Sequence, residues 1–307
     1  MAITNEKDIL KQLINNDSLF NNIHVINQKF DILPNENGHY GASIEYQDIS
    51  ELREEFLDEL YDTIVDWIYS SKKYEQLKKE AMKKGKTEQA ANSEVQRKAH
   101  NKFRANRNSE GLLIQGQLGE LLLFHFIQRY QKAAPLLRKM KITTSNKHER
   151  FGADAIHFKY EENRPIIILG EAKTYTSDYK FNQAFEEALD SIIATYYSHK
   201  KELNLYVHED FLDDDMNEIA EQYLNNKLKN VEVHLVSIVV YNETKNIQIT
   251  DEYDIRQQID NIIADRYKNF DKTKIDIKNN AILKRITYIV FPIWKLDELA
   301  QQFQDKL

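Results

Sequence analysis

The sequence predicts an α/β fold in which helices flank a mixed sheet, preceded by a mainly helical N-terminal region. Three observations support this prediction. Segments with helical and strand-like patterns follow one another as helix, strand, strand, helix, strand over residues 111–241. Gly (8) and Pro (4) are scarce among 307 residues, which argues against long disordered or collagen-like stretches. A hydrophobic content of 41% is enough for one large core or two modest ones.

The N-terminal region, residues 1–108, is expected to be mostly helical after a mixed beginning. Apolar residues recur at helical spacing over residues 49–84, which predicts one long helix. Gly85 interrupts this pattern, and a polar, basic helix is expected to continue to about Arg107. We therefore place the boundary with a second unit, residues 109–307, at this point.

The segment from Ser71 to Arg107 is basic in an acidic chain. It contains 12 Lys or Arg against 4 Asp or Glu, a net charge of +8, whereas the whole chain carries −7 and the remainder therefore −15. Polyanions are the obvious partner of such a segment. Lys98, Lys102, Arg104 and Arg107 are candidate nucleic-acid-binding residues. Charge alone explains the segment equally well as a solvated charged helix.

The second unit alternates helices with strands. Residues 111–130 form the most apolar predicted helix, and two strand-like runs follow at 153–160 and 165–173, joined by a turn. The elements expected after them are a long helix, a second helix, a strand, a third helix and a last strand, which begin near residues 181, 210, 231, 251 and 286, and a helix that closes the chain.

Glu120 is the only fully charged side chain between Gly111 and Gln128. On a helix it lies beside the apolar stripe, where a lone buried carboxylate is costly unless it is paired or binds a metal. Gly116 and Gly119 precede it, although a glycine inside a helix costs about 1 kcal/mol relative to alanine. Small residues there would let another backbone or a substrate come close. The alternative is a water-exposed glutamate at the edge of the stripe.

Asp154, Glu171 and Lys173 extend the apolar faces of two neighbouring strands, because side chains alternate along a strand. If the hairpin is symmetric about Glu162–Asn163, Asp154 faces Glu171 with Cβ atoms about 5 Å apart. Carboxylates at that distance repel each other unless a divalent cation lies between them. Lys173 could neutralise charge, hold a phosphate oxygen or position an attacking water. The alternative is a charged network on a solvated sheet edge.

These residues together resemble the core of the PD-(D/E)XK nuclease superfamily over roughly residues 110–245. The match consists of Glu120 on a helix, Gly-Ala-Asp ending at Asp154, and a strand that ends in Glu171-Ala172-Lys173. Ala153 replaces the proline of the superfamily's name. The resemblance implies a restriction-endonuclease-like α-β-β-β-α-β core and a Mg²⁺-dependent deoxyribonuclease, a phosphodiester hydrolase in which Mn²⁺ can replace Mg²⁺.

The resemblance also implies roles for single residues. Asp154 and Glu171 would bind the metal with the backbone carbonyl of Ala172, and Lys173 would orient the attacking water. Glu120 would complete a second metal site or bind a metal-bound water. The catalytic set expected from the resemblance is therefore Glu120, Asp154, Glu171 and Lys173.

The helix after the second strand carries two further candidates for contact with nucleic acid, Lys180 and Gln183. Some members of the superfamily carry Gln-x-x-x-Tyr on this helix. Here Gln183 is followed four residues later by Glu187, so that subtype is not supported.

The arrangement further resembles the nuclease subunits of the Hachiman antiphage defence system. The shared features are the charged N-terminal region, the Gly-x-x-Gly-Glu helix, the Glu-Ala-Lys strand and the late strand over residues 288–293. This resemblance implies DNA as substrate and a helicase subunit that restrains the nuclease. The alternative is a catalytically silent module of the same fold that binds nucleic acid or a partner protein. The residues themselves do not distinguish DNA from RNA, or internal cleavage from cleavage at ends.

Composition and the absence of apolar spans suggest a cytoplasmic protein with no membrane partner. The chain has no Cys, which excludes a disulfide framework and a thiolate metal site. The first residues, MAITNEKDILKQ, do not show a basic-then-apolar signal pattern, and the longest apolar runs are too short to span a bilayer.

Overall fold

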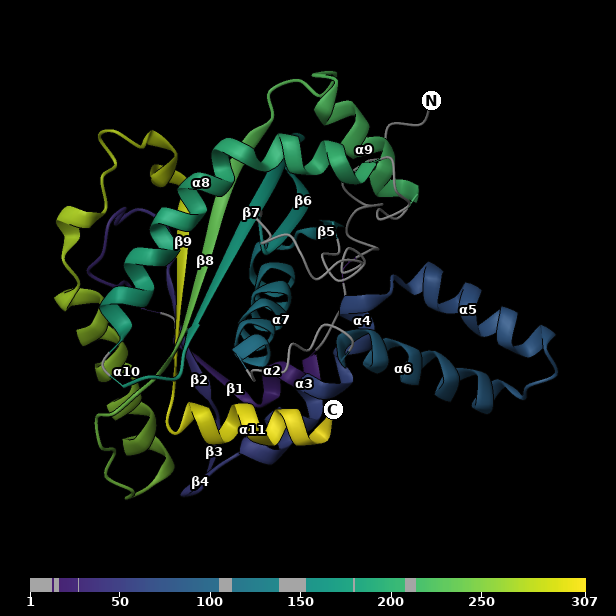
Figure 1. Ribbon diagram of the computed structural model, residues 1–307. Helices are drawn as coiled ribbons and strands as arrows, with labels where there is room; N and C mark the ends of the chain where they lie inside the picture. The colour runs from purple at the N-terminus through teal and green to yellow at the C-terminus, as the bar shows by residue number, and fades with distance from the viewer. Residues whose placement is uncertain are drawn as a thin grey trace.

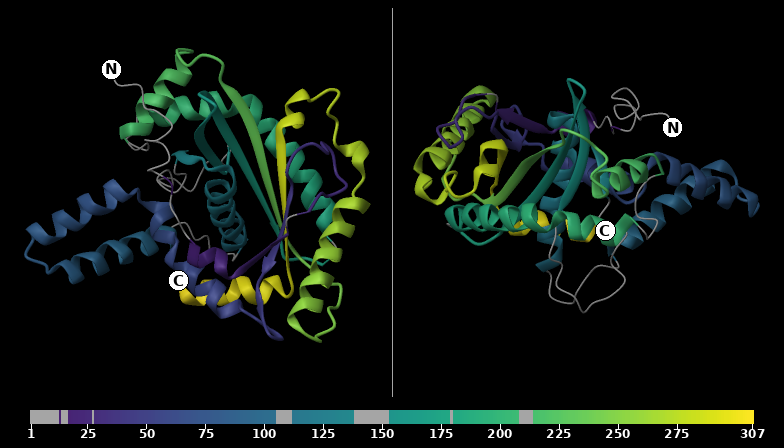
Figure 2. Two further views of the ribbon diagram at one scale, coloured as in Figure 1. Left: turned by 180° about the vertical axis from the view of Figure 1, so that it is seen from behind. Right: turned by 90° about the horizontal axis from the view of Figure 1, so that it is seen from above.

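A seven-stranded mixed sheet with helices on both faces forms the body of the protein (Figures 1 and 2). The structure, a computed structural model, describes residues 13, 17–26, 28–104, 112–137, 153–178, 180–207 and 214–307. A separate two-stranded ribbon consists of β3 (Tyr46–Gln47) and β4 (Ser50–Glu51). The predicted α/β class is confirmed.

The strands of the large sheet follow the order β1-β2-β9-β8-β7-β6-β5. The central strands β2, β9, β8 and β7 run parallel, and antiparallel strands complete both edges. Their bounds are Ile23–Ile26 (β1), Tyr40–Ile44 (β2), Ala134–Leu137 (β5), Ala155–Glu161 (β6), Arg164–Tyr175 (β7), Glu232–Asn242 (β8) and Ile286–Ile293 (β9). Two strands of the N-terminal region thus extend the sheet of the second unit. The boundary at residue 108 stays a prediction, since it falls outside the described residues.

Two long helices cover opposite faces of the sheet. The even-numbered core residues of β7, such as Ile168, pack with α7 (Leu112–Gln131), and the odd-numbered ones, such as Leu169, pack with α8 (Phe181–Val207). The remaining helices are α2 (Asp17–Asn21), α3 (Arg53–Asp62), α4 (Ile64–Ile68), α5 (Ser71–Lys83), α6 (Glu88–Arg104), α9 (Asp214–Leu224), α10 (Glu252–Asn269) and α11 (Leu296–Lys306). Strand alternation therefore decides which helix each β7 side chain meets.

Helices α5 and α6 form a hairpin that projects from the body (Figures 1 and 2). The single helix expected over residues 49–84 is wrong, because β4 occupies its beginning and the chain is extended at Tyr69 (φ −123°, ψ 138°). Ser70 then caps α5 by accepting a hydrogen bond from the Lys73 N–H at 3.2 Å. Gly85 lies in the turn with φ +88°, a conformation that glycine adopts without strain.

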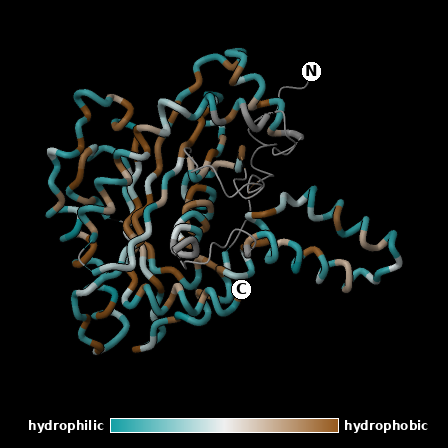
Figure 3. The backbone as a smooth tube through the Cα atoms, in the orientation of Figure 1, coloured by the Kyte–Doolittle hydropathy of each residue, from teal (hydrophilic) through white to brown (hydrophobic). Residues whose placement is uncertain are grey.

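Apolar residues gather on the strands and on α7, whereas the hairpin is mainly hydrophilic (Figure 3). Their packing forms two buried clusters, one on each face of the sheet. Among the described helices, none combines the length and the apolar character needed to cross a membrane.

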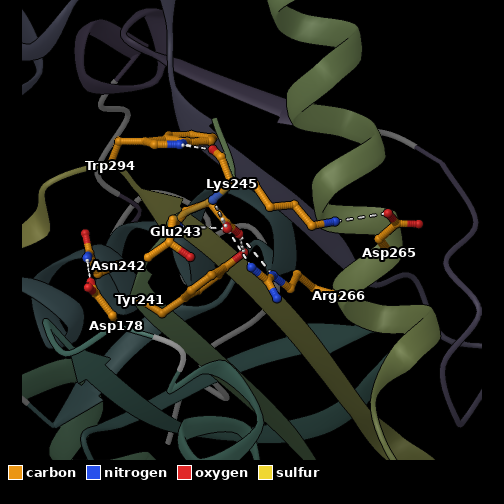
Figure 4. Close-up of polar contacts among 9 residues, drawn as sticks. Asp178, Tyr241, Asn242, Glu243, Lys245, Asp265, Arg266 and Trp294 are labelled. Carbon is orange, nitrogen blue, oxygen red and sulfur yellow. Dashed lines mark hydrogen bonds and ion pairs between the residues drawn. The ribbon is translucent and has the colours of Figure 1, made fainter. Parts of the chain in front are cut away.

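A buried ion pair ties the end of β8 to α10 (Figure 4). The Glu243 carboxylate accepts hydrogen bonds from Arg266 Nε (3.0 Å) and Nη2 (2.5 Å), and from the Tyr241 hydroxyl (2.8 Å). The backbone N–H groups of Thr244 and Lys245 also donate to it, both at 2.9 Å. Burial raises the pKa of Glu243, but these hydrogen bonds and the charge of Arg266 outweigh burial and leave the pKa below its ordinary value.

The residue before this ion pair connects two loops at the same end of the sheet. Asn242 donates to Asp178 Oδ1 at 2.5 Å (Figure 4). It also accepts a hydrogen bond from the Leu296 N–H at 3.1 Å. Asp178 lies between β7 and α8, and Leu296 begins α11 after β9, so these contacts hold together the ends of β7, β8 and β9.

Candidate active site

The β6–β7 hairpin has the register that symmetry about its turn predicts. Glu162 and Asn163 occupy the turn with positive φ angles of 49° and 63°, which suits a two-residue hairpin turn. The pairing extends back to Ala155 opposite Gly170. Asp154 lies just before the strand, and its N–H donates to the Gly170 carbonyl oxygen at 2.9 Å. The hairpin therefore brings Asp154 beside Glu171, as expected.

The Asp154 carboxylate accepts a hydrogen bond from the β7 backbone at the residue that follows Glu171. The N–H of Ala172 donates to Asp154 Oδ2 at 2.9 Å. In an extended strand the N–H and C=O of one residue point to the same side, so the Ala172 carbonyl oxygen is directed towards the Asp154 side. The ladder with β6 ends at Ala155, and no other described strand pairs with this edge of β7. A carbonyl oxygen is thus available beside the two carboxylates.

Glu171 is 3% exposed, and its two carboxylate oxygens have different surroundings. Oε1 accepts hydrogen bonds from Lys173 Nζ at 2.9 Å and from the Ser191 hydroxyl at 2.5 Å. Oε2 is buried and has no hydrogen-bond partner within the part of the chain that the structure describes. Burial and the negative charge of Asp154 raise the pKa of Glu171 against the opposing effect of Lys173. A buried carboxylate oxygen in this state is costly unless a cation binds it.

Lys173 places a positive charge beside this carboxylate. Its side chain is 28% exposed. Burial lowers the pKa of Lys173, but the charge and hydrogen bond of Glu171 outweigh burial, so the net pKa is raised. The ammonium group therefore stays protonated near neutral pH and can stabilise negative charge on a substrate.

A row of polar side chains on α8 leads away from Glu171. Gln183, Glu187 and Ser191 follow one another at four-residue spacing, which places them on one side of the helix. Lys180 Nζ donates to Gln183 Oε1 at 2.9 Å, and Gln183 Nε2 donates to Glu187 Oε1 at 2.8 Å. The Tyr175 hydroxyl donates to the other oxygen of Glu187. Exposed Lys180 and Gln183 thus lie on the side of α8 that carries Ser191.

Glu120 comes from the opposite face of the sheet. It lies on α7, whereas Glu171 and Lys173 point to the α8 side. A Cβ on Gly119 would overlap the Thr174 hydroxyl oxygen, so α7 lies very close to β7 at this level. Half-buried Glu120 is the next residue, beside the part of β7 that extends past the ladder with β6. The helical period predicts the apolar side of α7, but it does not reveal which face of the sheet that side covers.

Gly116, the other glycine of α7, has no close neighbour in the structure described. A Cβ on Gly116 would meet nothing within 4 Å, and the residue is exposed. The expectation of close backbone approach is therefore confirmed at Gly119, and Gly116 borders open space.

The oxygen atoms around Glu171 fit a hard divalent cation. In the described ranges, no group of three or more His, Cys, Asp and Glu side chains is arranged to hold a metal ion. Asp154 and Glu171 supply two carboxylates, and the direction of the Ala172 carbonyl adds a third oxygen. Mg²⁺ is commonly held by one or two carboxylates together with waters and substrate oxygens. Oε2 of Glu171, which accepts no hydrogen bond from the residues that the structure describes, supports this ligand set.

Contacts within the basic α5–α6 hairpin neutralise part of its positive charge. Lys98 pairs with Glu94 at 2.6 Å. Lys102 Nζ lies 4.8 Å from the centre of the Tyr69 ring, and burial together with the charge of Lys73 lowers its pKa. Arg104 ends α6, and Arg107 lies outside the described residues. Exposed basic residues that remain along the hairpin are Lys79, Lys83, Lys84 and Arg97.

Ser191 is the site residue that the sequence prediction missed. Its spacing of four residues from Glu187 and eight from Gln183 is a usable signal, because all three share one side of the predicted helix. A serine alone suggests no chemistry, however, and its contact with Glu171 depends on how α8 packs on the sheet.

Comparison with known protein families places this geometry in a defined group. The HamA family model matches residues 17–307, which include the N-terminal strands, the α5–α6 hairpin and every residue of the candidate site. No curated protein matches the chain. Because the family match covers nearly the whole sequence, the chain belongs to the HamA family of the Hachiman antiphage defence system.

Proposed function

We propose that this protein is a metal-dependent nuclease that hydrolyses DNA phosphodiester bonds as the effector of its antiphage system. One observation carries the proposal. Glu171 is buried beside Asp154, and one of its carboxylate oxygens accepts hydrogen bonds from Lys173 and Ser191. Its other carboxylate oxygen accepts no hydrogen bond from any described residue. The element order α7-β5-β6-β7-α8-β8, with α9 inserted between α8 and β8, supports a PD-(D/E)XK core, since it follows the α-β-β-β-α-β order of that superfamily.

In this mechanism Asp154 and Glu171 would hold Mg²⁺, or Mn²⁺ in its place, with the carbonyl oxygen of Ala172. When bound, the ion would supply Lewis-acid chemistry towards the scissile phosphate and a water. Lys173 keeps its proton, orients the attacking water and stabilises the negative charge that develops on the phosphate. The Ala172 N–H orients the Asp154 carboxylate by donating to Oδ2, which keeps that carboxylate beside Glu171.

Glu120 has a secondary role in this mechanism. It lies across the sheet from Glu171, level with the part of β7 that extends past the β6 ladder. From there it can reach the site only around this edge of β7. Its role is therefore to bind a second metal ion or a metal-bound water at the rim of the site.

The projecting hairpin and the first turn of α8 provide the surface for DNA. Lysine and arginine side chains on the hairpin bind the phosphate backbone without reading sequence. Lys180, which directly precedes α8, and Gln183 in its first turn lie on the side of α8 that carries Ser191, and they contact the strand that is cut. Arg104 and Arg107 are further candidates for phosphate contact because of their charge.

A helicase subunit of the same system is the partner that we propose. A nuclease that binds backbone phosphates without sequence preference needs restraint inside a cell. Membership of a defence system supports the existence of partner proteins. Co-purification of the chain with the product of a neighbouring helicase gene would test the pairing, and an unrestrained, harmless free subunit in cells would contradict it.

The activity is tested by incubating the purified chain with plasmid DNA and Mg²⁺ or Mn²⁺, with and without EDTA. Lys173→Ala is expected to lower the cleavage rate about 10²–10³-fold, since it removes a group that stabilises developing charge. Lys159→Ala is a matched control, because Lys159 lies on β6 and pairs with Glu161 at 3.4 Å. Metal-independent cleavage, or full activity of the Lys173 variant, would contradict the mechanism. DNA binding without cleavage would identify a silent module.

A further inference from the structure

We infer that Ser191 is a positioning residue that fixes the Glu171 carboxylate so that one oxygen is presented to the metal ion. This inference rests on the proposed function, and it assigns to α8 a part in building the metal site. Ser191 itself binds neither metal nor substrate. Its contact with Glu171 joins α8 to β7 through residues that are 20 positions apart in the chain.

The contact belongs to a closed triangle of three side chains. Ser191 Oγ donates to Glu171 Oε1 at 2.5 Å, and Lys173 Nζ donates to the same oxygen at 2.9 Å. Lys173 Nζ also lies 3.5 Å from Ser191 Oγ, where it can donate to the hydroxyl oxygen. The single hydroxyl proton is therefore committed to Glu171, and both donors act on Oε1. Oε2 is left buried and unpartnered among the described residues.

Ser191, rather than Lys173, determines which carboxylate oxygen of Glu171 accepts the two hydrogen bonds. The terminal torsion of a glutamate has broad, roughly two-fold preferences, so the side chain alone does not distinguish its two oxygens. Lys173 has a flexible four-carbon stem and could follow either oxygen. Ser191 has a short side chain on a helix whose neighbouring residues Ala188 and Ile192 are buried in the core. Its hydroxyl therefore approaches Glu171 from one fixed direction.

Loss of this hydroxyl should release the carboxylate. With alanine at position 191, Lys173 is the remaining donor to Oε1, and the carboxylate can rotate with it. Metal affinity falls because the ligand oxygen must be ordered at the moment of binding. Partners that orient metal ligands typically change affinity about 10–100-fold when they are removed.

The test is calorimetric titration of the full-length protein with Mn²⁺. Ser191→Ala is expected to weaken Mn²⁺ binding about 10–100-fold, whereas Ser191→Thr, which keeps the hydroxyl, restores most of the affinity. Ser198→Ala is the matched control on the same helix, since the Ser198 hydroxyl donates to the backbone oxygen of Ala194 at 3.0 Å. Ser191→Cys keeps the side-chain volume with a weaker hydrogen bond, and it provides an intermediate variant if alanine prevents folding.

Thermal unfolding without metal separates positioning from packing. A lower melting temperature of Ser191→Ala with unchanged Mn²⁺ affinity would mean a merely structural role and would overturn the inference. Weaker Mn²⁺ binding, together with cleavage that recovers at high Mg²⁺, supports it. If the wild-type protein and Glu171→Gln both fail to bind Mn²⁺, the proposed function itself is wrong, and the inference falls with it.

Discussion

Glu171 lies on β7, and Glu243 directly follows the neighbouring strand β8. Both glutamates are buried, and their surroundings differ in one respect. Both oxygens of Glu243 accept hydrogen bonds, from Arg266, from Tyr241 and from backbone N–H groups. Only one oxygen of Glu171 does so among the described residues. The pKa of Glu243 is lowered as a result, and the pKa of Glu171 is raised by burial and by Asp154.

The difference separates a carboxylate that serves the fold from one that is available to a ligand. A buried charge with every lone pair used is held in place, and its removal leaves the partner charge unpaired. A buried carboxylate with an unused oxygen reduces the stability of the empty protein and gains its missing partner when a cation binds. The same substitution at the two positions should therefore have different consequences.

The largest effect is expected for Glu171→Gln on cleavage. The amide keeps the shape of the side chain and removes a metal ligand, so the cleavage rate should fall about 10³-fold or more, which corresponds to several kcal/mol of transition-state stabilisation. Plasmid cleavage in saturating Mg²⁺ measures this decrease. Full activity of this variant would remove Glu171 from the site.

The second effect is expected for Glu243→Gln on stability. The substitution leaves the partly buried guanidinium of Arg266 without its carboxylate, and breaking a buried pair costs up to about 3–5 kcal/mol of unfolding free energy. Urea unfolding measures this change. Asp265→Ala, on the same helix, is the control. Asp265 forms an exposed pair with Lys245, whose removal should cost at most about 1 kcal/mol. Equal effects at both positions would contradict the assignment of Glu243 to the fold.

A smaller effect is expected in the pH dependence of unfolding. Because the folded pKa of Glu243 lies below the ordinary value of 4.5, its stabilising contribution is present above that value and disappears as pH falls through the folded pKa. Wild-type protein should therefore become less stable below pH 4.5 more steeply than Glu243→Gln. Urea unfolding at a series of acid pH values gives the two slopes, and parallel slopes would show that Glu243 does not contribute.

The smallest effect is expected on DNA binding when basic residues of the α5–α6 hairpin are replaced. Replacing exposed Lys83 and Lys84 with glutamine should weaken DNA binding about equally for all sequences, and the slope of affinity against salt should fall by about one for each phosphate that is no longer bound. Lys98→Gln should change less, because Lys98 is already paired with Glu94. Fluorescence anisotropy at several salt concentrations distinguishes these variants. If the salt dependence of binding is identical in all of these variants, DNA binds to a surface other than this hairpin.

Local rules predict the part of the site that lies on two strands. Alternation along β7 puts Glu171 and Lys173 on one side, and a two-residue turn with positive φ sets the register that brings Asp154 beside them. The polar row on α8 follows from helical spacing once the helix is known.

Contacts between distant elements could not be predicted in this way. The face of the sheet covered by α7 depends on the path of the chain, so helical spacing cannot place Glu120 across the sheet from Glu171 and Lys173. The pairing of β2 with β9 joins residues about 250 positions apart, which no local pattern reveals. Glu243 and Arg266 carry no motif, and each looks like an ordinary charged residue until β8 and α10 pack together.

Crystals of the full-length protein grown with Mn²⁺ would test the central claim most directly, through the anomalous scattering of the ion. The proposed site predicts a peak bound by Glu171 Oε2, the Asp154 carboxylate and the Ala172 carbonyl oxygen, and its disappearance in Glu171→Gln. A Mn²⁺ peak at another place, in a protein that cleaves DNA, would contradict the assignment of the active site to β7.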